Sequence, residues 1–110
     1  MQIFTNQEKD NLVLEVKGRI DAVTSPMLEQ ECQSWIDKGP QVMVLDMGGV
    51  EYISSAGLRT ILMLARKLNG TGREIRFAGL RDMVREVFTI SGFYSLFPIY
   101  PSVTEALGRS

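Results

Sequence analysis

Two adjacent serines in the segment VEYISSAGLR, residues 50–59, are the side chains of this chain best placed for chemistry. Ser54 and Ser55 stand where an apolar strand segment ends and a helical repeat of apolar residues begins. A serine at a helix start accepts a hydrogen bond from an unpaired amide of the first turn. The same amides and the helix dipole stabilise a phosphate attached there. The segment therefore predicts either a simple helix cap or a serine that can be phosphorylated.

Two minimal side chains, Ala56 and Gly57, follow the serines. Glycine costs a helix up to about 1 kcal/mol relative to alanine, so its presence in the first turn indicates a close backbone approach. That approach comes either from the protein's own fold or from another molecule. From the residues alone capping is the favoured interpretation, since most serines before an apolar helical run do no more.

The longer segment VLDMGGVEYISSAGLRTIL, residues 44–62, resembles the signature of STAS domains, particularly the free-standing anti-sigma factor antagonists. In that signature an apolar strand ends in Asp or Asn, and Asp-Ser-Ser/Thr-Gly-Leu then opens a helix. Laid on this chain, the phosphorylatable serine corresponds to Ser55. Ser54 departs from the pattern, because the family carries an acidic residue there.

Two further segments carry the same resemblance. GRIDAVTSP, residues 18–26, is similar to the Gly-Glu-Leu/Ile-Asp element of the family and the helix start after it. FTISGFYSLFPIYPSVTEAL, residues 88–107, resembles the Phe-x-x-Ser-Gly-Leu/Phe ending. The resemblance covers nearly the whole chain in the right order, which is more specific than any single motif.

The resemblance implies a partner-switching regulator that is not an enzyme. Unphosphorylated, it would bind a serine kinase of the anti-sigma type; phosphorylation on Ser55 would release it, and a phosphatase would reset it. ATP and Mg²⁺ would belong to the kinase, so the chain itself has no catalytic residues, metal or cofactor. We expect a cytoplasmic protein that is a monomer when free, with no nucleic-acid partner and no membrane insertion.

Other polar residues near the serines have local interpretations. Asp21 follows a strand end, where a turn or capping carboxylate is expected; the resemblance adds a position at the same edge of the sheet as Ser55. Thr24 is predicted to be a hydroxyl of the cap region rather than a second phosphorylation site. Asp46 ends a buried strand and is expected to bond amides around Gly48.

Three residues beyond the serines predict a partner-binding surface: Arg59, Met63 and Arg66 share one helix face. The opposite face carries the apolar residues Leu58, Ile61, Leu62 and Ala65. An exposed methionine between arginines suits an adaptable contact surface. Family relatives often carry glycine at the position of Arg59, so this residue departs from the family's pattern.

The elements that must position these residues alternate between strand and helix, which predicts an α/β fold. Strands are expected at residues 2–5, 12–17, 42–45, 74–77 and 97–100, with Gly18 breaking the second. The first helix is expected to begin with Ser25 as its N-cap and Pro26 as its first residue. The second is expected to run from the serine pair to Gly70, the third over residues 80–92, and the last after Ser102. We therefore expect one domain, residues 1–110, with a mixed, mainly parallel sheet of four to five strands and about four helices largely on one face.

Composition limits the remaining possibilities. The 110 residues are 45% hydrophobic and 23% charged, with a net charge of −1, so no global field attracts nucleic acid. No apolar run is long enough to cross a bilayer, and no signal peptide is visible. The chain has no histidine, which removes the usual general base, and one cysteine, Cys32, which excludes an internal disulfide.

Two alternatives from other functional classes stay open. Related STAS domains act in transporters and sensor assemblies, so a module that binds a nucleotide or a lipid is one of them. An enzyme that uses Asp21, Asp46 and a serine is the other, although no base is available to activate the hydroxyl.

Overall fold

Strands and helices alternate along the chain, and the strands form one sheet. The computed structural model describes residues 1–108. Its strands are β1 (Gln2–Glu8), β2 (Asn11–Ile20), β3 (Val42–Ile53), β4 (Glu74–Ala78) and β5 (Ile99–Tyr100). Its helices are α1 (Ser25–Ile36), α2 (Ser55–Asn69), α3 (Asp82–Ile90), α4 (Phe93–Leu96) and α5 (Val103–Ala106).

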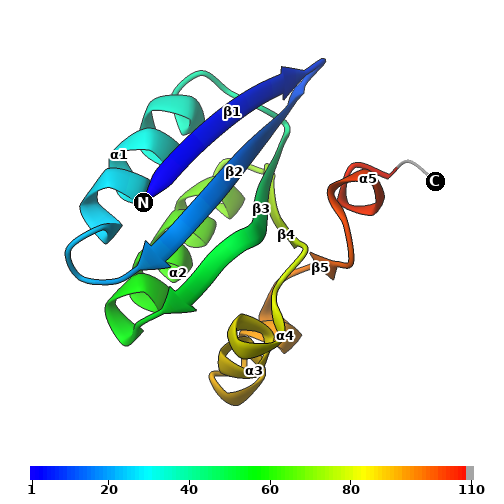
Figure 1. The fold of residues 1–110 in the computed structure, drawn as a ribbon. Coiled ribbons are helices and arrows are strands. Elements are labelled where there is room, and N and C mark those ends of the chain that lie inside the picture. Colours follow the sequence, from blue (N-terminus) through cyan, green and yellow to red (C-terminus); the bar gives the residue numbers. More distant parts are fainter. Residues whose placement is uncertain (109–110) are drawn as a thin grey trace.

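The sheet has the strand order β1-β2-β3-β4-β5 (Figure 1). β1 pairs with β2 in the antiparallel sense, and the other neighbours are parallel. This arrangement confirms the predicted small α/β domain with a mainly parallel sheet. Because β2 and β3 run in parallel, the segments that follow them, including Asp21 and Ser54, emerge at the same edge. We call it the carboxyl edge.

The main core lies between the sheet and the first helices. Alternate residues of β2, such as Leu12 and Leu14, are fully buried against apolar residues of α1, α2 and α3, including Leu28, Ile61 and Val84. In Figure 1, α1 and α2 lie together on one side of the sheet. The prediction that the helices lie largely on one face is therefore confirmed.

A smaller cluster covers part of the other sheet face. α5 places Ala106 on the sheet beside Val44 of β3 and Ala78 of β4, and all three are fully buried. The Arg76 guanidinium donates to the carbonyl oxygen of Ala106 at 2.6 Å, which attaches α5 to β4. The short α4 was not predicted, and it brings the number of helices in residues 1–108 to five.

The first three strands are longer than the sequence predicts. β1 continues to Glu8 and β2 begins at Asn11, so the turn between them contains only Lys9 and Asp10. Gly18 does not break β2. The pairing of β2 with β3 shifts register on either side of it, and its φ of 101° is the left-handed conformation that glycine adopts without strain.

Three other predicted boundaries are wrong. The strand expected at residues 97–100 is shorter, since β5 contains only Ile99 and Tyr100. Asp46 does not end a strand, because β3 continues along β2 as far as Ile53. Ser25 is not the N-cap of α1: Thr24 holds that position, and Ser25 is the first helical residue. The Thr24 side chain makes no capping bond to α1, because it is used in the turn that precedes the helix.

Candidate functional site

Ser54 closes the start of α2. Its backbone is extended, and its Oγ accepts a hydrogen bond from the backbone N–H of Gly57 at 3.1 Å. Its own N–H donates to the carbonyl oxygen of Ile20 at 2.9 Å, which ties the helix start to the end of β2. Of the two serines that could cap this helix, the structure therefore assigns the cap to Ser54.

Ser55 has a different environment. It is the first residue of α2 and is exposed, whereas Ser54 is half-buried. The Ser55 hydroxyl makes no hydrogen bond to any residue in the described range 1–108. The backbone amides of Ser55 and Ala56 belong to the first turn and have no acceptor within the helix. The structure thus presents a free hydroxyl beside free amides at the positive end of a helix.

Gly57 explains how close α2 lies to the sheet. A Cβ built on Gly57 would lie 2.8 Å from both the carbonyl oxygen and the Cγ2 atom of Ile20, and 3.0 Å from Cγ1 of Ile53. The close approach inferred from the sequence is therefore made by the fold itself. It seats the first turn of α2 between the ends of β2 and β3.

Asp21 and Thr24 form a self-contained turn after β2. One Asp21 carboxylate oxygen accepts from the backbone N–H groups of Val23 and Thr24, each at 3.0 Å. The Thr24 hydroxyl donates to the carbonyl oxygen of Arg19 at 2.7 Å and accepts from the Asp21 N–H at 2.9 Å. The hydrogen bond from the Thr24 amide is the largest of the effects that lower the pKa of Asp21 from its ordinary value. The hydrogen bond from the Val23 amide and the charge of Arg19 lower it further.

This turn lies at the carboxyl edge together with the serines, because Ile20 pairs with Ile53 at the ends of β2 and β3. The observed contacts give Asp21 the turn role that its residue type predicts. They also use the Thr24 hydroxyl fully. Neither residue forms a hydrogen bond with Ser55 among the described residues.

The three predicted surface residues of α2 do not have equal exposure. Arg59 and Arg66 are exposed, whereas Met63 is half-buried. Arg59 and Met63 line a groove of about 310 Å³ between α1 and α2, which we call the α1–α2 groove. Its α2 wall is completed by Ala56 and Thr60, and its α1 wall consists of Ala22, Ser25, Pro26 and Glu29.

The α1 wall was missed from the sequence. Ser25 is only 5% exposed, and its hydroxyl has no hydrogen-bond partner among the described residues. The sequence signal was a serine before Pro26, which is equally typical of a helix cap. Exposed apolar side chains also lie around this edge: Val23 is 87% exposed and Met27 49%.

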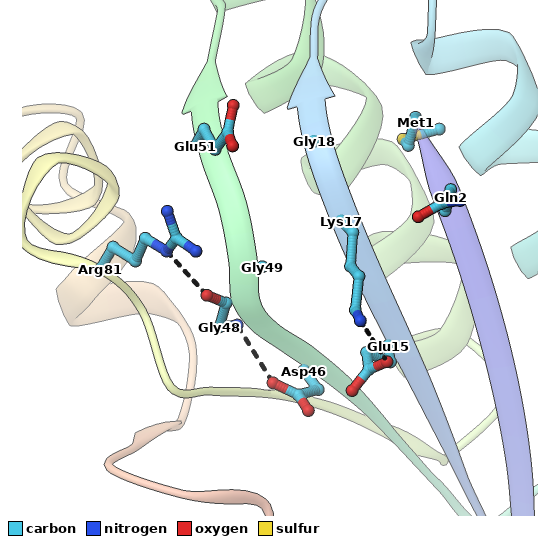
Figure 2. A pocket seen from close by; sticks show the side chains of 10 residues that line it. All are labelled: Met1, Gln2, Glu15, Lys17, Gly18, Asp46, Gly48, Gly49, Glu51 and Arg81. Atoms are coloured by element: carbon cyan, nitrogen blue, oxygen red, sulfur yellow. Dashed lines mark hydrogen bonds and ion pairs between the residues drawn. The ribbon is translucent and has the colours of Figure 1, made fainter.

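A larger hollow of about 670 Å³ lies on the sheet face away from α1 and α2 (Figure 2). Its charged residues are Glu15, Lys17, Asp46, Glu51 and Arg81. Lys17 pairs with Glu15 at 3.6 Å, and Arg81 donates to the carbonyl oxygen of Gly48 at 2.8 Å. As predicted, Asp46 accepts from the Gly48 amide, at 3.1 Å. Carboxylate side chains outnumber cationic side chains here, and Lys17 and Arg81 both have partners, so these side chains do not favour a phosphate-bearing ligand.

Across residues 1–108, no three His, Cys, Asp or Glu side chains come together as metal ligands would. No helix in the same range is both long and apolar enough to cross a bilayer.

With this geometry established, the comparisons with known proteins identify the class. The family model described as STAS domain matches residues 2–106. The chain therefore belongs to the STAS domain family, as the sequence resemblance indicates.

Two relatives within this family are named as anti-sigma factor antagonists. The protein BtrV of Bordetella bronchiseptica, whose name assigns it provisionally to the anti-sigma factor antagonists, is 42% identical over 90% of this chain and 85% of its own. A crystal structure of an anti-sigma factor antagonist from Mycobacterium paratuberculosis is 29% identical, with a TM-score of 0.89 over 97% of this chain and 91% of that one. These relatives are named as regulators rather than enzymes.

A more distant structure shares only the fold. The Bacillus cell fate determinant SpoIIAA in its phosphorylated form is 16% identical, with a TM-score of 0.76 over 97% of each chain.

Proposed function

We propose that this chain is a phosphorylation-controlled, partner-switching antagonist of an anti-sigma factor. Unphosphorylated, it binds a serine kinase that is also the anti-sigma factor, and phosphorylation of Ser55 releases it. The observation that carries the proposal is the division of roles between the two serines. The Ser54 hydroxyl caps α2, whereas the Ser55 hydroxyl is exposed and without a hydrogen bond in residues 1–108.

The chemistry of the switch belongs to the kinase. The Ser55 oxygen attacks the γ-phosphorus of ATP; the new O–P bond forms as the bond to ADP breaks, and the hydroxyl proton leaves to a base of the kinase. ATP and Mg²⁺ are bound by the kinase, so this chain is a substrate and a ligand. A phosphatase restores the hydroxyl by hydrolysis, and inorganic phosphate leaves. Because the kinase uses ATP, the proposal places the chain in the cytoplasm.

The start of α2 suits both states of such a switch. A phosphoserine adds about −1.5 to −2 charges at pH 7. The fold tolerates this charge, because the free amides of Ser55 and Ala56 and the helix dipole favour an anion. In a closely packed interface the same group must lose water, which costs several kcal/mol at most. Each 1.4 kcal/mol is about tenfold in affinity, so a modest cost separates the pair.

The surface around Ser55 supports docking of a protein. The α1–α2 groove has Met63 in its wall, and Val23 and Met27, which follow the lining residues Ala22 and Pro26 in the chain, are exposed. We assign partner binding to this groove together with Arg59 and Arg66. A methionine can adapt to different partners because its side chain is flexible and polarisable.

The proposal is tested with the kinase encoded nearest to this chain's gene, or with one captured by pull-down. After incubation with ATP and Mg²⁺, mass spectrometry should find phosphate on Ser55. We expect Ser55→Ala to bind the kinase as the natural chain does and Ser55→Asp to bind at least tenfold more weakly. Ser54→Asp is the matched control, since Asp also caps helices. Phosphate only on Ser54 or Thr24, or equal binding by both Ser55 variants, would contradict the proposal.

A further inference from the structure

Arg59 is an exposed arginine one helical turn after Ser55. Side chains four residues apart on a helix lie on the same side, and the Cα–Cβ bonds tilt toward the N-terminus. The Arg59 side chain can therefore reach back to the start of α2. The ion pairs of residues 1–108 join Lys17 to Glu15, Arg19 to Asp21 and Arg76 to Glu74, so none of them involves Arg59.

Arg59 also forms part of the wall of the α1–α2 groove. Glu29 lines the same groove without pairing to Arg59. Ser25 lines it too, but its hydroxyl oxygen is buried and has no hydrogen-bond partner among the described residues. Arg59 is therefore an exposed cation in the wall of this groove that forms no ion pair with any residue of 1–108.

We propose that Arg59 changes partner with the state of Ser55. In the unphosphorylated chain its guanidinium forms the wall of the α1–α2 groove and is available to a bound protein. When Ser55 carries phosphate, the guanidinium pairs with the phosphate oxygens, together with the free amides of the first turn. This inference rests on the proposed function, because it concerns the same serine.

The chemistry favours the pair. A phosphate dianion offers three acceptor oxygens, and the planar guanidinium donates two parallel hydrogen bonds to such a group. The consequence is a switch with two effects. Phosphorylation adds negative charge to the docking surface, and it also withdraws from the groove an arginine that the partner contacts. Loss of either effect should make the switch weaker.

The experiment needs no kinase. Phosphoserine is incorporated at position 55 during translation, and its second ionisation is followed by ³¹P NMR between pH 4 and pH 9. An arginine next to the phosphate favours the dianion and lowers this pKa. We expect Arg59→Gln to raise the phosphate pKa by about 0.15–0.4 unit. The difference should shrink in 1 M salt, since exposed charges are screened.

Arg66→Gln is the matched control, because Arg66 is exposed on the same helix but eleven residues from Ser55, too far to reach the phosphate. It should leave the phosphate pKa unchanged, and Arg59→Lys should keep part of the effect. Arg19, Asp21 and Glu29, the other charged groups around this edge, are the same in all variants. Circular dichroism checks that each variant is folded.

Two results overturn the inference: equal phosphate pKa values in the natural, Arg59→Gln and Arg66→Gln chains, or an equal rise in both variants. Neither bears on the proposed function, which is tested by partner binding. If the chain with phosphoserine 55 binds the kinase as tightly as the unmodified chain, the proposed function fails, whatever the phosphate pKa. The two failures are therefore distinguishable.

Discussion

Ser54 and Ser55 have the same side chain but different environments. The oxygen of Ser54 accepts a hydrogen bond from the Gly57 N–H, whereas that of Ser55 has no hydrogen-bond partner within residues 1–108. The sequence could not separate them, because both are good cap residues and stand at adjacent positions. The difference is set by the backbone: the Ser54 N–H donates to the Ile20 carbonyl oxygen at the end of β2, which fixes Ser54 as the last extended residue before α2.

Ser54 and Ser55 should contribute differently to the free energy of unfolding. Ser54→Ala removes the cap and should lower the free energy of unfolding by about 1 kcal/mol. Ser55→Ala removes only an exposed hydroxyl and should change it by less than about 0.5 kcal/mol. Urea unfolding followed by circular dichroism measures both. Equal losses would show that Ser55 also takes part in the fold.

The Cys32 thiol should resist ionisation and reaction in the native chain. Burial of its side chain raises the pKa of Cys32 from an ordinary 9.0 to about 12, with a smaller effect from the charge of Glu31. The native thiol should therefore not react with a thiol reagent at pH 8, whereas the thiol of the urea-unfolded chain should react fully.

The raised pKa of Cys32 also makes the stability of the fold depend on pH. Above pH 9 the unfolded chain loses the Cys32 proton and the native chain keeps it, so this contribution to stability declines as the pH rises from 9 toward 12. Cys32→Ala should remove that part of the decline, as measured by urea unfolding at each pH. An identical decline in the alanine variant would contradict it.

At the scale of elements, the start of α2 depends on its contact with the ends of β2 and β3. Gly57→Ala gains up to about 1 kcal/mol of helix propensity. The added Cβ, however, would lie 2.8 Å from the Ile20 carbonyl oxygen, and such overpacking costs about 1–3 kcal/mol. We expect a net loss of stability in urea unfolding.

Gly70→Ala at the other end of α2 is the matched control for Gly57→Ala. There the nearest atom to the added Cβ is the Arg66 carbonyl oxygen at 3.3 Å, so the loss should be smaller. An equal or larger loss at Gly70 would mean that the contact of α2 with Ile20 is not the limiting one.

The elements themselves were predictable where the apolar pattern has one clear period. The alternation in β2 and the helical repeat of α2 located both elements correctly, including the end of α2 at Gly70. Strand ends were missed where glycines suggested a break, since Gly18 instead lies at an irregularity of a continuous strand. Such an irregularity depends on the neighbouring strand, which a local pattern does not contain.

The site was predictable only in part for a similar reason. The resemblance and the helix start predicted Ser55 at the exposed start of α2, and the helical period predicted the outward-facing arginines; their roles stay predictions. The α1 wall of the groove, with Ser25 and Glu29, arises from the packing of two helices far apart in the chain. The spacing of residues within a single segment therefore could not predict this wall.

At the scale of the whole molecule, the candidate site occupies one edge of the sheet. The proposed switch should therefore be local. With phosphoserine at position 55, ¹H–¹⁵N spectra should change at the first turns of α1 and α2 and in the turn that contains Asp21. Resonances of α5, which packs on the other sheet face, should keep their positions. Broad changes in α5 would indicate a conformational change through the sheet.

The position of α5 also has a practical use. Thr104 is exposed on this short helix, while the Ala106 side chain beside it anchors the helix to the sheet. A fluorescent dye attached through a cysteine introduced at Thr104 would sit on the opposite side from the groove, and the natural Cys32 is too buried to compete for the label. Such a probe would allow the affinity of a captured protein to be titrated in solution without obstructing the surface on which that protein lands.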